Sequence, residues 1–171
     1  MIARLVSCER GTTLLETTIA AAILLVVLVG LLSMATVATS LTENEGHLAA
    51  RTAEYAQDKM EQLLSLKFGD QQSDTTLFPT TTAGGTGLAA GGSSDPSAPA
   101  LGYVDYLDRD GHLLCPCTAT PPTDWFYKRV WTVESLSATL KQITVTSTVS
   151  LAVAQAFTPK STMAALKSSP F

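Results

Sequence analysis

One carboxylate stands at the mouth of a long apolar stretch, and its position is the strongest chemical signal in the sequence. Glu16 directly precedes a window from Thr17 to Thr42 that holds no charged residue. An ionised carboxylate at the edge of a hydrocarbon layer is costly unless a cation pairs with it. The nearest cations along the chain are Arg4 and Arg10. The position of Glu16 therefore predicts that its carboxylate needs a cationic partner for this segment to be stable in a membrane.

Two closely spaced cysteines are the second unusual feature. Cys115 and Cys117 flank a proline, and the remaining cysteine, Cys8, lies before the apolar stretch. A C-x-C pair lacks the thioredoxin C-x-x-C spacing, and no second pair exists to complete a zinc site. A local disulfide, which is strained at this separation, a bond to another chain and free thiols all stay open. We favour a structural, oxidised role for Cys115 and Cys117.

Other titratable residues do not form a recognisable catalytic or metal pattern. Asp105, Asp108 and Asp110 lack the full spacing and the distal Glu of a calcium-binding loop, so turn chemistry is the preferred interpretation. The only histidines are His47, within a predicted helix, and His112, beside the predicted turn. There is no nucleophile elbow, phosphate loop or metal-spaced histidine pair. The sequence predicts no catalytic residue, no metal and no cofactor.

Length and charge limit the chain to one modest domain behind an apolar helix. The chain has 171 residues and a formal net charge of −4. It has no basic run or stripe, so nucleic acid is not a predicted partner. The window 17–42 is long enough, as a helix, to cross the roughly 30 Å hydrocarbon core of a bilayer. Arg4 and Arg10 before this window, with acidic residues after it, predict a cytoplasmic N-terminus and an external C-terminal head.

A secretory signal peptide, a plain signal anchor and a prepilin leader are three interpretations of this N-terminus. The apolar stretch is too long for the first, and neither of the first two explains Glu16. The segment from Glu9 to Glu16 resembles the type III signal of prepilins, in which a short basic leader ends in Gly and a Glu occupies the fifth mature position. Gly11 would end that leader. Thr12 departs from the Phe or Met that usually follows, which leaves its N-methylation open.

The resemblance implies a processing and assembly pathway. Prepilin peptidase would cut between Gly11 and Thr12, leaving the helix in the bacterial inner membrane with its head in the periplasm. The new α-amine of Thr12 in one subunit could then pair with Glu16 of a neighbour and set the axial register. The implied partners are other pilin or pseudopilin subunits, the peptidase, inner-membrane lipid and the assembly platform.

The helix is expected to continue beyond the membrane, from near Thr13 to Lys67. Small or apolar residues alternate three and four apart and predict an amphipathic face: Ala49, Ala53, Ala56, Met60 and Leu63. Charged residues are assigned mostly to the other faces: Arg51, Glu54, Asp58, Lys59 and Glu61. This part also resembles, more loosely, the helices of PilV-type minor pilins and I-type secretion pseudopilins.

A small sheet is predicted after a low-complexity stretch. Residues 70–102 are rich in Thr, Gly, Ser and Pro and are interpreted as a long exposed loop, either a displayed variable region or a plain linker. Residues 103–157 are expected to form an antiparallel sheet from four segments: a hairpin of 103–107 with 112–114, and strands over 125–134 and 141–151. Residues 158–171 are expected to fray as a flexible tail.

Taken together, these patterns predict an α+β fold. The resemblance implies that residues 1–11 are the leader. Residues 12–42 are expected to be the transmembrane half of the helix and 43–69 its amphipathic half, packed on the sheet. The resemblance implies a minor pilin or pseudopilin, a structural subunit and not an enzyme. The alternative is a membrane-anchored periplasmic binding module unrelated to filaments.

Overall fold

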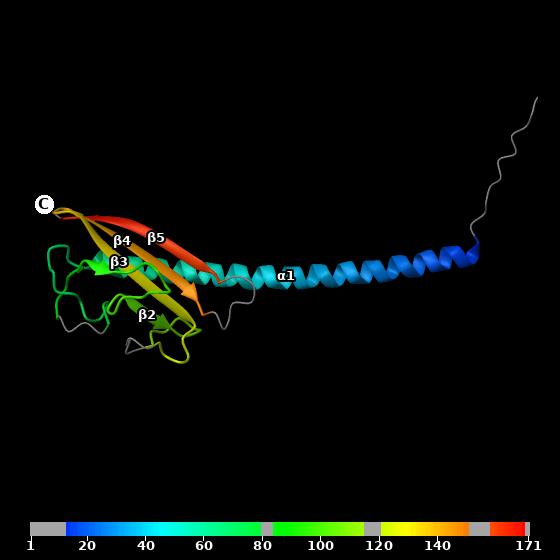
Figure 1. Cartoon of the computed structure of the whole chain (residues 1–171), viewed down its shortest axis with the longest axis horizontal. Helices are drawn as coiled ribbons and strands as arrows, with labels where there is room; N and C mark the ends of the chain where they lie inside the picture. The colour runs from blue at the N-terminus through cyan, green and yellow to red at the C-terminus, as the bar shows by residue number, and fades with distance from the viewer. Residues whose placement is uncertain (1–12, 80–83, 115–120, 151–157, 170–171) are drawn as a thin grey trace, which may run out of the picture. The chain divides into compact units, whose positions relative to one another are not determined.

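The computed structural model of the chain describes residues 13–79, 84–114, 121–150 and 158–169. These residues form one α-helix and five strands (Figure 1): α1 Leu14–Ser65, β1 Gly91–Gly92, β2 Val104–Leu107, β3 Tyr127–Ser137, β4 Leu140–Val149 and β5 Lys160–Ser168. A long N-terminal helix with an antiparallel sheet confirms the predicted α+β class. The chain divides into two compact units, Met1–Glu43 and Asn44–Phe171, and we call the second unit the head.

Helix α1 begins with a side-chain cap. The N–H of Glu16 donates to the hydroxyl of Thr13 at 3.3 Å. A threonine at this position satisfies one of the amide donors that the first turn of a helix leaves without a partner. Helix α1 begins at Leu14, one residue after the predicted start near Thr13.

The hydroxyl groups of residues 13–43, the described part of the first unit, are satisfied within the helix itself. Seven of them donate to carbonyls three or four residues earlier: Thr17, Thr18, Ser33, Thr36, Thr39, Ser40 and Thr42. A hydroxyl bonded in this way needs no water, so it can lie in an apolar environment at little cost. The polar residues of this stretch are thus compatible with a hydrocarbon surrounding.

The head is built on a five-stranded antiparallel sheet. The strand order is β1-β3-β4-β5, and β2 pairs with β3 beside β1. The predicted last hairpin is confirmed as β3 and β4, which pair from Tyr127↔Val149 to Val133↔Ile143. Its connecting turn is shorter than predicted, because the ladder continues through a register shift between Ser135 and Ser137 to the pair Ser137↔Leu140.

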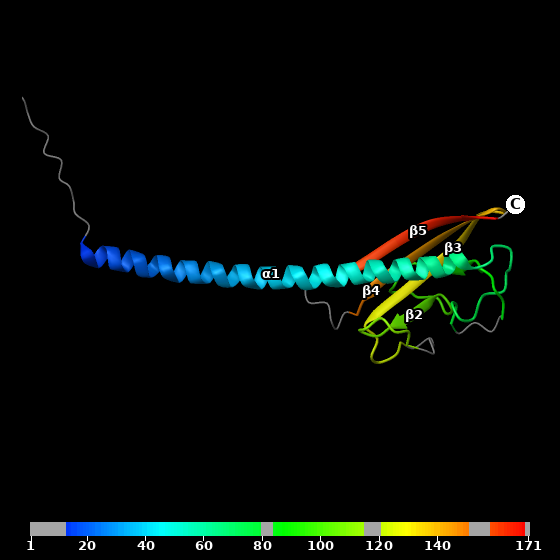
Figure 2. The ribbon, with the colours of Figure 1, turned by 180° about the vertical axis from the view of Figure 1, so that it is seen from behind.

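The core of the head lies between α1 and the inner face of the sheet. On the helix, Ala56, Met60 and Leu63 are buried, and they contact Trp131 and Ile143 from β3 and β4. Figure 2 shows this part of α1 running across the strands. Full burial of such side chains stabilises a fold by about 1.5–3 kcal/mol each. This contact is what attaches the helix to the sheet.

The predicted apolar face of the helix is only partly correct. Ala49 is exposed and Ala53 half-buried, whereas Thr52, Tyr55 and Lys59 are buried. The buried face is rotated around the helix axis relative to the predicted one, because these three residues contact partners in the head. Thr52 shares a hydrogen bond with Ser161 of β5 at 2.9 Å, and Tyr55 packs edge-to-face on Tyr127. Periodicity in apolar residues could not anticipate partners of this kind.

The prediction of a flexible tail over 158–171 is wrong for Lys160–Ser168, which forms strand β5. It pairs with β4 from Leu140↔Ser168 to Thr148↔Lys160. Along β5 every second residue is half-buried, and Met163 and Ala165 pack against the core. Small and polar residues are sufficient here because the strand lies at the sheet edge and buries one face only.

Two further expectations need correction. The low-complexity stretch 70–102 does not lie entirely exposed, because Phe78 and Leu88 are fully buried in the core and Gly91–Gly92 pairs with β3. In the predicted 103–114 hairpin, β2 pairs with β3 instead, and the return segment makes a single bridge, Leu107↔Leu113. Leu107 thus pairs with Tyr127 of β3 and also with Leu113 of the return segment.

Two glycines of the head should respond oppositely to alanine. At Gly111, φ is +90° and an added Cβ would lie 2.4 Å from the Tyr55 hydroxyl, so Gly111→Ala is expected to destabilise the head by about 1–3 kcal/mol. At Gly46, within α1, nothing lies within 4 Å of the added Cβ, so Gly46→Ala should stabilise it by up to about 1 kcal/mol. Urea unfolding of the full chain in detergent, followed by tryptophan fluorescence, measures both. If both variants changed the free energy of unfolding in the same direction, this account of the two glycines would be contradicted.

Candidate functional site

The first candidate is the apolar surface of α1 within residues 13–43. Every described residue of this unit is exposed, and its large apolar side chains reach 82% exposure at Leu14 and 75% at Met34. An apolar window of mean hydropathy 2.7 makes α1 the one helix, among the described residues, that is long and apolar enough to span a membrane. So large an exposed apolar surface is unstable in water. This part of α1 is therefore compatible with a single membrane-spanning anchor.

Glu16 lies in the first turn of this helix. The described residues offer its carboxylate no cation. An acidic residue in the first turn is favoured by the helix dipole, and the spacing Thr13-x-x-Glu16 is that of a capping box. The T-x-x-E pattern was visible in the sequence, and its capping role was missed there. Gly11 and Thr12 lie outside the described residues, so cleavage between them stays a prediction.

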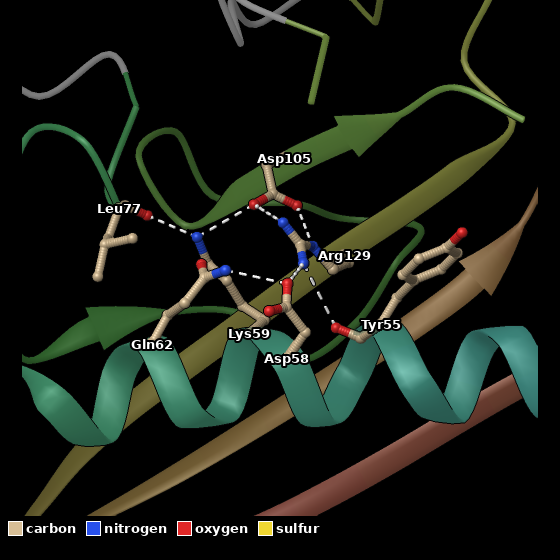
Figure 3. Close-up of polar contacts among 7 residues, drawn as sticks. All are labelled: Tyr55, Asp58, Lys59, Gln62, Leu77, Asp105 and Arg129. Atoms are coloured by element: carbon tan, nitrogen blue, oxygen red, sulfur yellow. Dashed lines mark hydrogen bonds and ion pairs between the residues drawn. The ribbon is translucent and has the colours of Figure 1, made fainter. Parts of the chain in front are cut away.

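The second candidate is a buried charge cluster in the head (Figure 3). Its centre is Asp105 of β2, whose side chain is 1% exposed. Arg129 of β3 binds it with two parallel hydrogen bonds, Nε to Oδ1 at 2.7 Å and Nη2 to Oδ2 at 2.8 Å. Lys59 of α1 places its Nζ 3.0 Å from Oδ2. One carboxylate thus joins the helix to two strands.

Both cations make further contacts outside Asp105. Lys59 Nζ donates to the Leu77 carbonyl at 2.8 Å and lies 4.1 Å from the centre of the Trp131 ring. Arg129 Nη1 donates to Asp58 Oδ2 at 2.8 Å. Asp58 also accepts a hydrogen bond from Gln62 and is 55% exposed. The cluster therefore runs from a closed interior to the protein surface, and its charges balance in number.

The pKa values of the cluster follow from two opposing effects. Burial raises the pKa of Asp105, but Lys59 and Arg129 together outweigh it, so the pKa lies below its ordinary value. For Arg129, burial lowers the pKa, yet Asp105 and Asp58 raise it overall. These shifts favour the charged forms of Asp105 and Arg129. Such an arrangement holds elements in one register, because sliding the helix would leave a charge buried without a partner.

Sequence reasoning missed this cluster. Lys59 was assigned mostly to the solvent side of the helix, and Asp105 was grouped with the turn aspartates; both assignments are wrong, because each side chain is at most 2% exposed. The sequence did carry a signal, because Asp105 lies among apolar residues in the segment that forms β2. All four positions of this strand are buried. A lone charge in such a run needs a buried partner of opposite charge.

The turn interpretation of Asp108 agrees with the structure. Asp108 Oδ1 accepts hydrogen bonds from the N–H groups of Asp110 and His112, and Oδ2 lies 3.1 Å from His112 Nδ1. These bonds, led by the His112 amide, lower the pKa of Asp108. The ligand atoms of Asp108, Asp110 and His112 lie within 4.8 Å of one another at an exposed turn. The hydrogen bonds of Asp108 are those of a turn, and metal binding by this group stays untested.

Comparison with protein-family models, curated proteins and solved structures found no match to this chain. The resemblance carried by residues 9–16 therefore stays a prediction. Cys115 and Cys117 lie outside the described residues, and their predicted oxidised role likewise stays open to test. What the molecule itself offers is an exposed apolar helix with an acid in its first turn and a head locked by buried charges.

Proposed function

We propose that this chain is a minor pilin or pseudopilin, a structural subunit of a type IV pilus or type II secretion-like filament. The observation that carries the proposal is α1: one helix whose N-terminal part is apolar, wholly exposed and preceded by Glu16, and whose C-terminal part packs on a sheet. The apolar part would wait in the inner membrane and then pack against other subunits. The head would face the periplasm.

The exposed helix surface supports close packing of helices. Lipid tails are as apolar as the helix, so association in a membrane depends on tight contact and on polar pairs. The backbone is accessible at four small residues: Ala20, Ala21, Ala22 and Gly30. Apart from the nearby backbone of the helix, no described residue lies within 4 Å of a Cβ built on Gly30. A neighbouring helix could approach closely along these positions.

The pairing of Glu16 would supply the specific contact. Cleavage after Gly11 removes the basic leader and creates an α-amine on Thr12. In a filament this amine would lie against Glu16 of an adjacent subunit and neutralise it, much as one buried polar residue sets register in a coiled coil. The unpaired state of Glu16 among the described residues supports such an external partner.

The N-terminal residue of the mature protein tests this proposal. Coexpression with prepilin peptidase should yield a chain that starts at Thr12, measured by N-terminal sequencing or intact mass. Expression without the peptidase is the control and should leave Met1 in place. A mature chain that starts at Met1 despite the peptidase, or at Thr39, would instead favour a membrane-anchored binding module.

A further inference from the structure

A pocket of about 730 Å³ opens at the C-terminal end of α1, within the head. Its lining combines the Phe68 and Lys141 side chains with Ser135, Ser137 and Ala138 from the end of the β3–β4 hairpin. This volume falls in the range of small-molecule sites, about 300–1,000 Å³. The lining is mixed, because polar side chains of Gln71, Ser135, Ser137 and Lys141 lie beside Phe68 and small Ala and Gly residues.

Lys141 is the charged group of this pocket. It is 9% exposed, and its Nζ donates to the carbonyls of Phe68 and Leu88 at 2.8 Å each. The same Nζ lies 4.7 Å from the centre of the Phe68 ring. An ammonium group has three N–H donors, so two carbonyl bonds leave one donor for a further acceptor. Burial lowers the pKa of Lys141.

A second lysine increases the positive charge here. Lys167 of β5 is the register partner of Lys141, and its Nζ donates to the carbonyls of Leu64 and Leu66. Neither ammonium group has a carboxylate at ion-pair distance among the described residues, in contrast to Lys59 with Asp105. Carbonyls at the end of α1 supply only partial charges. Neutral carbonyls therefore hold both ammonium groups, and the acidic residues that adjoin the pocket lining along the chain are Asp70 and Glu134.

We propose that this pocket binds a small organic carboxylate. The carboxylate would accept the remaining N–H of Lys141, and the hydroxyls of Ser135 and Ser137 would donate to it. Its apolar body would lie against Phe68 and the alanines of the lining. This activity goes beyond the proposed filament role and does not depend on it.

The test uses the full chain in lipid nanodiscs, titrated with butyrate and followed by the backbone amide NMR signals of Ser135 and Ser137. Butyramide, which has the same shape without the charge, is the matched ligand control. We expect saturable shifts with butyrate and none with butyramide. Equal binding of butyramide, or the absence of saturable shifts, would overturn the proposal.

Variants locate the site. Lys141→Gln removes the charge, and Ala138→Phe fills the pocket from an exposed turn while both lysines stay in place. Each should weaken butyrate binding by about tenfold or more, since a charge-assisted hydrogen bond or the space itself is lost. Ala164→Phe, on the exposed face of β5, should leave binding unchanged. Unaltered binding in Ala138→Phe would overturn the assignment even if Lys141→Gln proved poorly folded.

Discussion

Asp105→Asn is expected to lower the free energy of unfolding of the head by about 3–5 kcal/mol. The substitution keeps the size of the side chain but removes the charge that Lys59 and Arg129 share. Both cations would then be buried, at 2% and 4% exposure, without a buried counter-charge. Asp58 could compensate only from the surface, where its carboxylate is 55% exposed. Urea unfolding of the full chain in detergent measures the loss.

Asp110→Asn is the matched control. Asp110 stands on the same segment as Asp105, but it is exposed at the turn and its carboxylate accepts no hydrogen bond among the described residues. Its replacement should change the stability by no more than about 0.5 kcal/mol. Comparable losses in the two variants would show that the buried cluster does not stabilise the head in the way argued here.

The same cluster gives the head a defined response to acid. Because the pKa of Asp105 is lowered on folding from its ordinary value of 3.8, its contribution is fully present above that pH. It is lost as the pH falls through the lower, folded pKa, since protonation then favours the unfolded chain. Asp70, Asp74, Asp95 and Asp108 are shifted in the same direction. Asp105→Asn should therefore flatten the acid limb of a stability–pH curve without abolishing it.

Glu16→Ala should give a chain that is made, processed and inserted in the membrane but is absent from filaments. The expected loss is nearly complete, because each subunit would bring an unpaired α-amine into an apolar environment. Immunoblots of membrane and sheared filament fractions, from a strain that lacks the native copy, measure the partition. Normal incorporation of Glu16→Ala would contradict the proposed pairing.

Two further variants separate the charge of Glu16 from its place in the first helical turn. Glu16→Gln removes the charge but keeps a side chain that suits a capping box, so it should fail like Glu16→Ala if pairing is what matters. Glu43→Ala removes an exposed carboxylate at the other end of the uncharged window and should enter filaments normally. Failure of Glu43→Ala as well would point to a general charge effect.

Several elements could be predicted because their signals are local. The uncharged window after Glu16 specifies an apolar helix through its length and composition, whatever surrounds it. The pattern over 141–151 predicts a strand, and β4 covers Leu140–Val149 with Ile143, Val145 and Val149 buried. The polar residues Thr146 and Thr148 are buried as well, which local alternation did not predict. In each case neighbouring residues along the chain carry the whole pattern.

Other elements depended on partners far along the chain. Strand β5 has too little apolar character to be recognised alone, and it is ordered by its ladder with β4 and by contacts to α1. From the sequence, Lys59 is expected to face solvent, because its buried partner Asp105 lies far along the chain. The contacts of Lys141 and Lys167 with carbonyls at the end of α1 could not be predicted, because they form only when β4 and β5 pack there.

By itself, the sequence determined the apolar helix, the acid at its start, the fold class and the central hairpin, because periodicity and composition act over a few residues. Only the tertiary structure decided which charges are buried, which helix face meets the sheet and where a pocket forms. Those outcomes require groups from distant segments to meet in a space from which water is excluded, where an unpaired charge is too costly to persist.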